Sequence, residues 1–307
     1  MATLLSKMSN FIPEAGIWLN TQRPEWNDAN NALVGNGTSM VTLYHLRRFL
    51  KFWEAQFGNS KHEKLSVSEE ISRLFSNIYQ VFEEHQAILE TGFSNQQRKS
   101  MTDALGEAHS KFRGEIYQFS FSGERKNITT KELKGFCEIC LKYIDQSIQK
   151  NKRADGLYHS YNLITFHEDA VSVRNLYEML EGQVAILSSG LLSVQESLQV
   201  LNALKKSAIY RKDQYSYMLY PNRELPRFVD KNNIPKGMVE KSKLLKKLVE
   251  NKETSIIKAD EHNHYHFNSA FRNAEALDKA LDNLRIGNYG HLVEEEKDLI
   301  LSVYEQI

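Results

Sequence analysis

A tryptophan, a carboxylate and several amides are gathered in the stretch "RPEWNDANNALVGNG" at residues 23–37. Asp28 follows Trp26 and Asn27 directly, and a carboxylate that an indole partly shields from water has the raised pKa that a general acid needs near neutral pH. Amides such as Asn31 exchange hydrogen bonds with hydroxyl groups, and an indole offers a flat apolar face to a sugar ring. These residue types suit carbohydrate chemistry, although Asn and Asp are also the preferred caps and turn formers before a helix.

Histidines and carboxylates form a second polar stretch, "ADEHNHYHFNSAFRN", at residues 259–273. Its three histidines alternate, so on an extended strand they would share one face, as zinc or nickel ligands can. Because no wider ligand pattern accompanies them, we predict no metal site and expect a polar wall of an active site or a surface loop. The candidates for a second carboxylate are Asp260 and Glu261. The candidates for a second-carboxylate or phosphate-binding site are Glu261, His262, His266 and Arg272.

The composition excludes several classes of function. The 307 residues include 39 basic and 39 acidic side chains and 41% hydrophobic residues, as in soluble globular proteins. This balance favours neither nucleic acid nor an anionic membrane as a partner, and no apolar run approaches the roughly 20 residues of a membrane span. The N-terminal segment lacks the basic flank of a secretion signal. We therefore expect a cytoplasmic protein that carries no cofactor.

The cysteines, Cys137 and Cys140, have the C-x-x-C spacing of redox and metal sites. They lie within a helical apolar pattern, however, and no second cysteine pair completes a zinc site. We predict two thiols on a helix face in a reducing compartment, with redox chemistry as the alternative.

Long amphipathic segments must position these residues. Residues 38–57 place apolar side chains along one helical stripe, with Thr38 or Ser39 as the cap. Residues 211–237 hold three of the five prolines and are predicted to form a long loop. Similar helical patterns cover residues 68–89, 95–117, 130–150, 176–207, 240–251 and 294–307, and short β-like pieces occur at 215–221 and 253–268. The prediction is an all-α fold of paired helices with long loops and minor β pieces.

The stretch "EWNDANN", followed by "GNGTSMVTLYHLRRFL", resembles the D-W-N-D-G-M-N motif and the helix after it in the inverting cellobiose and chitobiose phosphorylases and their relatives with (α/α)6 barrels. In that family the Asp after W-N is the general acid that protonates the glycosidic oxygen. The resemblance therefore implies this role for Asp28, with Trp26, Asn27 and Asn31 binding the substrate. It also implies that the helices form a six-hairpin (α/α)6 toroid.

A second resemblance lies in "NLYEMLEGQVAILSSGLL", residues 175–192. This stretch is similar to the part of the family in which a Glu-small-Gln triplet opens a helix that leads to a turn rich in Ser and Gly. Glu181 and Gln183 occupy the Glu and Gln of the triplet, which implies that they bind the substrate. The alternative is an ordinary first turn of a helix.

Members of this family are longer and carry a β-sandwich and several barrel helices ahead of the acid. Here the acid lies at residue 28, and the chain ends at Ile307 within an amphipathic pattern. We therefore expect residues 1–307 to form a single partial catalytic-type domain, an incomplete (α/α)6 toroid truncated at both ends. Its uncovered apolar flanks predict self-association or binding to the missing part of a parent chain.

The implied function is inverting cleavage of β-linked oligosaccharides by a glycoside phosphorylase or a glycoside hydrolase. An inverting hydrolase needs a base carboxylate roughly 6.5–9.5 Å from the acid, whereas in a phosphorylase inorganic phosphate attacks directly. Because no convincing second carboxylate accompanies Asp28, the sequence favours phosphorolysis, with phosphate as a co-substrate. The alternative is a non-catalytic helical scaffold or a sugar-binding remnant of such an enzyme, and whether this segment is itself active stays open.

Overall fold

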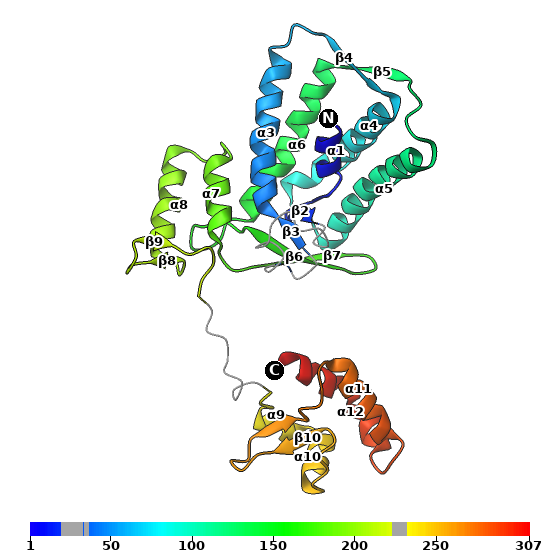
Figure 1. The fold of residues 1–307 in the computed structure, drawn as a ribbon, viewed down its shortest axis with the longest axis vertical. Coiled ribbons are helices and arrows are strands. Elements are labelled where there is room, and N and C mark those ends of the chain that lie inside the picture. The colour runs from blue at the N-terminus through cyan, green and yellow to red at the C-terminus, as the bar shows by residue number, and fades with distance from the viewer. Residues whose placement is uncertain (20–32, 34–36, 223–231) are drawn as a thin grey trace. The chain divides into compact units, whose positions relative to one another are not determined.

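A computed structural model of the protein describes residues 1–19, 33, 37–222 and 232–307 (Figure 1). The chain divides into two compact units, which we call unit 1 (Met1–Asn222) and unit 2 (Arg223–Ile307). Each unit has its own hydrophobic core. The structure thus contains two units where the sequence analysis expected one domain.

An antiparallel five-stranded sheet runs through unit 1 in the order β1-β2-β3-β6-β7. Its strands are β1 (Phe11–Ile12), β2 (Gly16–Leu19), β3 (Gly37–Ser39), β6 (Tyr161–Phe166) and β7 (Val171–Asn175). Two-stranded ladders join β4 (Lys64–Ser68) to β5 (Arg125–Thr129) and β8 (Tyr210–Arg211) to β9 (Ser216–Tyr217). The prediction of an all-α fold, an incomplete (α/α)6 toroid, is therefore wrong, because the chain is a mixed α/β protein.

Pairing between distant segments explains this error. Strands β1, β2 and β3 contain 2, 4 and 3 residues, too few to show the alternation by which a strand is recognised in a sequence. In the central ladder Gly37 pairs with Leu163 and Ser39 with Tyr161, so the partner strand lies far along the chain. No local sequence window contains that information.

Most helix predictions are confirmed. The helix predicted at 38–57 begins after Ser39, whose side chain accepts a hydrogen bond from the backbone N–H of Thr42. The helix predicted at 130–150 has those bounds and begins with a capping box between Thr129 and Glu132. The helices are α3 (Met40–Gly58), α4 (Glu69–Glu84) with the 3₁₀ turn η1 (Gln86–Glu90), α5 (Asn95–Phe119) and α6 (Thr130–Lys150).

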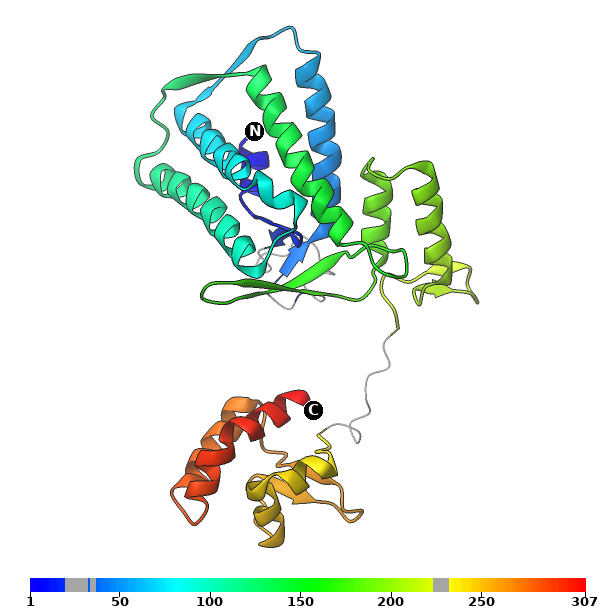
Figure 2. The ribbon, with the colours of Figure 1, turned by 180° about the vertical axis from the view of Figure 1, so that it is seen from behind.

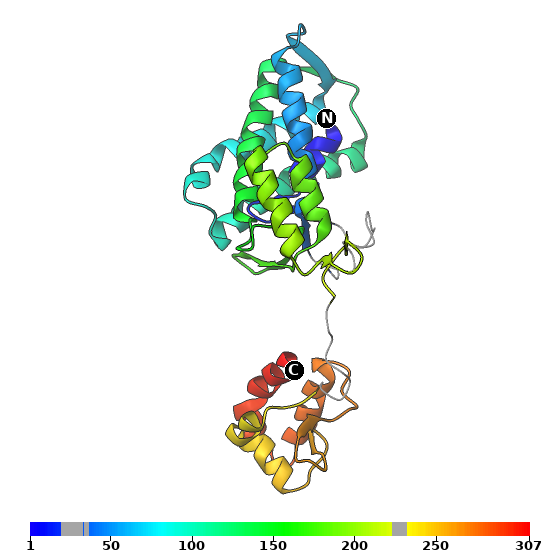
Figure 3. The ribbon, with the colours of Figure 1, turned by 90° about the vertical axis from the view of Figure 1, so that its left-hand side faces the viewer.

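The single helix predicted at 176–207 is wrong. Two helices occupy this range, α7 (Leu180–Ser188) and α8 (Val194–Lys206), and they pack side by side (Figures 1 and 3). Gly190 lies between them with φ +71°, a backbone conformation that favours glycine and ends the first helix.

The sheet and the long helices of unit 1 share one core. Figures 1 and 2 show α3, α4, α5 and α6 together, with the five-stranded sheet across one end of them and α1 (Ala2–Met8) leading into β1. Phe11 of β1 packs against Phe82 of α4 and Tyr143 of α6, with ring centroids 5.9 and 6.2 Å away. The sheet is therefore held by the helices whose ends it covers.

Unit 2 consists of α9 (Lys236–Lys241), α10 (Lys243–Glu250), the hairpin of β10 (Ile257–Ala259) and β11 (Tyr265–Phe267), α11 (Ala274–Arg285) and α12 (Gly290–Gln306). Helices predicted at 240–251 and 294–307 correspond to α10 and α12, and the β-like pieces at 215–221 and 253–268 are confirmed as well. Helix α11 was not predicted. Apolar side chains of α10, α11 and α12 form the core of the unit, among them Leu244, Leu248, Leu277, Leu281 and Ile300.

Candidate functional site

The motif residues Trp26, Asn27, Asp28 and Asn31 lie outside the described residues. The strands on either side of them are described, because the connection leaves β2 at Leu19 and enters β3 at Gly37. Leu19 and Gly37 are cross-strand partners, so the two ends of the connection are adjacent in the sheet. Asp28 therefore belongs to a segment whose ends are held together by hydrogen-bonded strands.

Gly37 lies in a position where no side chain fits. A Cβ built on it would lie 2.4 Å from Leu33 Cδ2 and 2.5 Å from the backbone oxygen of Asn162. Leu33 is itself buried, so it packs directly on the backbone where the connection returns to the sheet. The same strand is fixed at Thr38, whose hydroxyl donates to the backbone oxygen of Ala15 over 2.7 Å.

Glu181, in the first turn of α7, is in contact with the strand that neighbours β3. The buried Tyr161 of β6 donates its hydroxyl hydrogen to Glu181 Oε2 over 2.5 Å, and Tyr161 is the cross-strand partner of Ser39. Glu181 is thus bound to β6, the strand next to β3, and the connection that contains Asp28 ends at β3. Its side chain is only partly buried, so it is accessible to a ligand.

The side chain of Gln183 is hydrogen-bonded to backbone groups of the protein. Its side-chain oxygen accepts from the backbone N–H of Tyr158 over 2.9 Å, and its amide nitrogen donates to the backbone oxygens of Tyr158 and Met179 over 2.6 and 3.0 Å. Gln183 is fully buried. Both amide hydrogens are therefore used inside the protein, and Gln183 joins α7 to the chain before β6.

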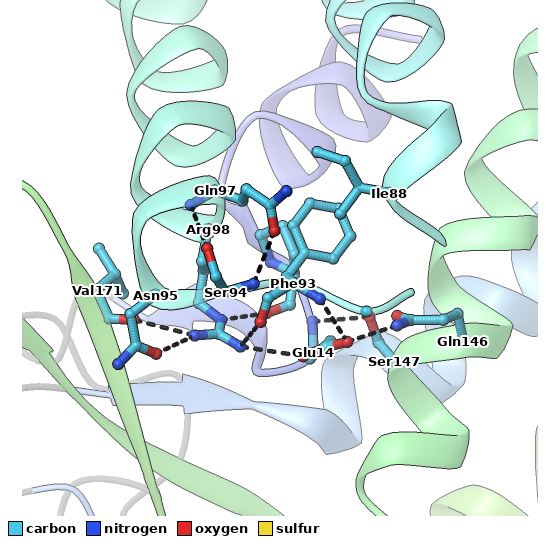
Figure 4. Close-up of polar contacts among 12 residues, drawn as sticks. Glu14, Ile88, Phe93, Ser94, Asn95, Gln97, Arg98, Gln146, Ser147 and Val171 are labelled. Atoms are coloured by element: carbon cyan, nitrogen blue, oxygen red, sulfur yellow. Dashed lines mark hydrogen bonds and ion pairs between the residues drawn. The ribbon is translucent and has the colours of Figure 1, made fainter. Parts of the chain in front are cut away.

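A buried ion pair links the β1–β2 turn to β7 through α5 (Figure 4). Arg98 of α5 lies 3.0 Å from Glu14 Oε2, through Nη2, and its guanidinium also donates to the backbone oxygens of Pro13 and Val171. The two side chains are only 7% and 11% exposed. Burial lowers the pKa of the Arg98 guanidinium, and the charge of Glu14 opposes this shift. The pair holds the β1–β2 turn, α5 and β7 together.

Glu14 supports this network with an unusual backbone. Its φ of 61° is in the left-handed region, which non-glycine residues rarely adopt. Its N–H donates to Ser147 Oγ over 3.0 Å, its carbonyl accepts from Asn151, and its carboxylate accepts from Gln146 of α6 over 2.6 Å (Figure 4). These contacts fix both the backbone and the side chain of Glu14, and they hold it in this strained conformation.

The histidine stretch of unit 2 forms a hairpin whose histidines do not share one strand face. His266 lies in β11, whereas His262 and His264 precede that strand, in the turn after β10. His264 and His266 converge instead on Asp260, with Nδ1 and Nε2 at 3.2 and 3.5 Å from Asp260 Oδ2. The second ring nitrogen of His266 lies 3.0 Å from the backbone oxygen of Asn232.

Asp260 organises this turn. Its Oδ1 accepts the backbone N–H groups of His264 and His262, each over 2.8 Å. These hydrogen bonds, with the one from His264 as the largest cause, lower the pKa of Asp260 to about 2. The carboxylate is therefore ionised at neutral pH and is unsuited to act as a general acid there.

The remaining predicted residues of unit 2 lie on its surface. The side chains of Glu261, His262 and Arg272 are exposed. Within the ranges that the structure describes, no group of three or more His, Cys, Asp or Glu side chains has the arrangement of a metal site. The described helices also include none that is long and apolar enough to cross a lipid bilayer.

The cysteines occupy the predicted kind of position. Cys137 and Cys140 lie on α6 as buried free thiols. Burial raises the pKa of Cys137 to about 12 and raises that of Cys140 as well. Neither thiol is activated as a nucleophile.

Three residues of these networks were not predicted from the sequence, namely Tyr161, Arg98 and Glu14. Tyr161 begins a segment, "YNLITF", whose aromatic and β-branched residues are typical of a strand and could have revealed β6. No local pattern signals the pair of Arg98 and Glu14, which are 84 residues apart.

Residues 225–307 match the family model of GH149 phosphorylase insertion domain 2. This range nearly coincides with unit 2, Arg223–Ile307. The match supports a glycoside phosphorylase family and a role in carbohydrate metabolism, which agrees with the coarser part of the sequence resemblance. No curated protein matches the chain.

Proposed function

We propose that the chain is part of an inverting glycoside phosphorylase that cleaves β-linked oligosaccharides, with Asp28 as the general acid. The match of residues 225–307 to a phosphorylase insertion domain carries the choice of reaction class. The W-N-D motif is the reason for choosing Asp28 as the acid, and this motif lies in unit 1, outside the matched range. The two observations concern different parts of the chain and favour the same class of enzyme.

In this reaction Asp28 gives its proton to the glycosidic oxygen while a phosphate oxygen attacks the anomeric carbon from the opposite face. The glycosidic C–O bond breaks, a C–O bond to phosphate forms, and the configuration at the anomeric carbon is inverted. No base carboxylate is required, because phosphate is itself the nucleophile, whereas water would need one. Inorganic phosphate is thus the proposed co-substrate and the oligosaccharide the proposed partner.

Substrate contacts are assigned to Trp26, Asn27 and Asn31, which flank the acid, and to Glu181. The carboxylate of Glu181 is accessible, lies one strand from the end of the Asp28 connection and is oriented by Tyr161. An ionised carboxylate accepts hydrogen bonds from two sugar hydroxyl groups at once.

In this proposal Gln183 positions a substrate-binding residue and does not contact the substrate itself. Since its amide hydrogens are bound to backbone oxygens, its role is to hold the first turn of α7, and with it Glu181, against the chain before β6.

Among the four candidates of unit 2 for binding phosphate, Arg272 has the most suitable side chain. Its guanidinium is exposed and matches the geometry of phosphate oxygens. His266 already faces the carboxylate of Asp260, which repels an anion. Glu261 and His262 lie next to the same carboxylate in sequence and remain the candidates for a second carboxylate or an accessory group.

The test is product analysis with a panel of β-linked disaccharides and oligosaccharides, with and without inorganic phosphate, for the protein and its Asp28→Asn variant. We expect sugar 1-phosphate only when phosphate is present, and a loss of activity of at least about 100-fold in the variant, the lower end of what general acid catalysis contributes. Asp169→Asn, a change at an exposed carboxylate of unit 1, is the matched control and should retain full activity.

The competing outcomes are distinct. Free sugar released without phosphate would make the protein a hydrolase, which needs a base carboxylate in addition to Asp28. A folded protein that binds oligosaccharides without turnover would instead be the non-catalytic scaffold or sugar-binding remnant.

A further inference from the structure

A cleft of about 830 Å³ opens in unit 2 beside the hairpin of β10 and β11. Its walls come from the hairpin, from the segment that follows β11 and from α12. The volume falls within the roughly 300–1,000 Å³ that is typical of ligand sites. Every lining residue belongs to unit 2, so the cleft is a feature of that unit by itself.

One wall is aromatic and held in place. Tyr304 packs edge-on against Phe267 and Phe271, with ring centroids 5.2 and 6.4 Å away and interplanar angles of 74° and 79°. The hydroxyl of Tyr304 donates to the backbone oxygen of Phe271 over 3.3 Å. Phe271 and Tyr304 are only partly buried, so parts of both rings remain available to a ligand.

The other lining groups are polar and of balanced charge. Lys258 and Ser269 are exposed, and Asp260 is fixed by the backbone N–H groups of His262 and His264. An ionised carboxylate has about four acceptor positions. In Asp260 they face the backbone N–H groups of His262 and His264 and the rings of His264 and His266, so Lys258 and Ser269 are the polar groups that remain for a ligand. The single positive charge of Lys258 and the single negative charge of Asp260 cancel, which disfavours an anionic or cationic ligand. The polar groups equally disfavour a purely apolar one.

We propose that this cleft is a second carbohydrate site, which binds a neutral oligosaccharide segment separately from Asp28. Sugars combine hydroxyl groups, which suit Lys258 and Ser269, with C–H faces, which suit the rings of Phe271 and Tyr304. The inference takes from the proposed function only the choice of β-linked glucans as probes. Asp28 lies in unit 1, so the two sites can be tested separately.

The experiment is native gel electrophoresis of the full chain through gels that contain soluble mixed-linkage β-glucan, with dextran gels as the polysaccharide control. We expect retardation by the β-glucan and not by dextran. Phe271→Ala should weaken binding about tenfold and Lys258→Ala at least about threefold, by loss of a stacking surface and of a hydroxyl contact. Lys279→Ala is the matched control, because Lys279 is an exposed lysine of α11 outside the cleft.

Two results would overturn the inference: no retardation by β-glucan, or equal retardation of the protein and both cleft variants. Since Phe271 packs partly in the core, Lys258→Ala, a change at an exposed side chain, decides the matter if the Phe271 variant fails to fold. Asp28→Asn must keep the retardation even though phosphorolysis is lost, which distinguishes failure of this site from failure of the proposed reaction.

Discussion

Arg98 and Glu14 form an ion pair with Nη2 3.0 Å from Oε2, although both side chains are almost entirely buried. Arg98→Met would leave the Glu14 carboxylate buried without its positive partner. We expect a loss of about 3–5 kcal/mol in the free energy of unfolding, measured by urea denaturation. Arg73→Met is the control, because the pair of Arg73 with Glu115 is 56% and 33% exposed and should contribute at most about 1 kcal/mol. Equal effects of the two substitutions would contradict the role given to the buried pair.

A substitution at Gln183 tests whether this residue stabilises the fold or contacts the substrate. Gln183→Leu removes the partners of the N–H and C=O groups of Tyr158 and of the Met179 carbonyl, all in a buried place. We expect a destabilisation of at least about 1–3 kcal/mol by urea denaturation. Gln80→Leu, at an exposed position of α4, should change stability little. A Gln183 variant that keeps its stability but loses substrate affinity would show that Gln183 contacts the sugar itself.

Glycine substitutions should act in opposite directions at two positions. A Cβ at Gly37 would lie 2.4 Å from Leu33 Cδ2 and 2.5 Å from a backbone oxygen, so Gly37→Ala forces the connection or the strand to move. We expect about 1–3 kcal/mol of destabilisation from this overpacking. A Cβ at Gly106, inside α5, meets nothing within 4 Å, and Gly106→Ala should stabilise the helix by about 0.5–1 kcal/mol. Thermal unfolding of both variants checks these two predictions. A Gly37→Ala variant of unchanged stability would disprove the close packing.

The Asp260 turn should respond to acid. Because the folded protein lowers the pKa of this carboxylate from 3.8 to about 2, its ionised form stabilises the folded hairpin above about pH 4. That contribution is lost as the pH falls through about 2. Amide hydrogen exchange at His262 and His264 should therefore quicken, after correction for intrinsic rates, between those pH values. Asp260→Asn should not show this dependence, and an unchanged pH profile in the variant would assign the effect to another group.

The sequence predicts the long helices well because each carries its own periodicity and caps. Ser39 and Thr129 begin α3 and α6 as local capping rules require. The five-stranded sheet could not be predicted in the same way. Its central strands become strands only because Gly37 meets Leu163, a pairing that depends on the folded chain.

The candidate site shows the same division. Asp28, Glu181 and Gln183 are identified by a resemblance of short motifs, and spacing in the sequence alone does not separate a ligand contact from a backbone clamp. The structure shows that Glu181 is partly exposed and bound by Tyr161, whereas Gln183 is buried and bound by backbone groups. The histidines illustrate the opposite case, since alternation suggested one strand face and a turn at Asp260 brings two of them together.

The most direct test of the central proposal is the anomeric configuration of the sugar phosphate that the protein releases from a β-linked oligosaccharide. Phosphorus NMR during the reaction distinguishes the two anomers as they form. Attack by phosphate opposite to the leaving group, with Asp28 as the acid, predicts the α-anomer alone, and formation at least about 100-fold slower by the Asp28→Asn variant. A β-anomer, or sugar phosphate formed at an undiminished rate by that variant, would contradict it.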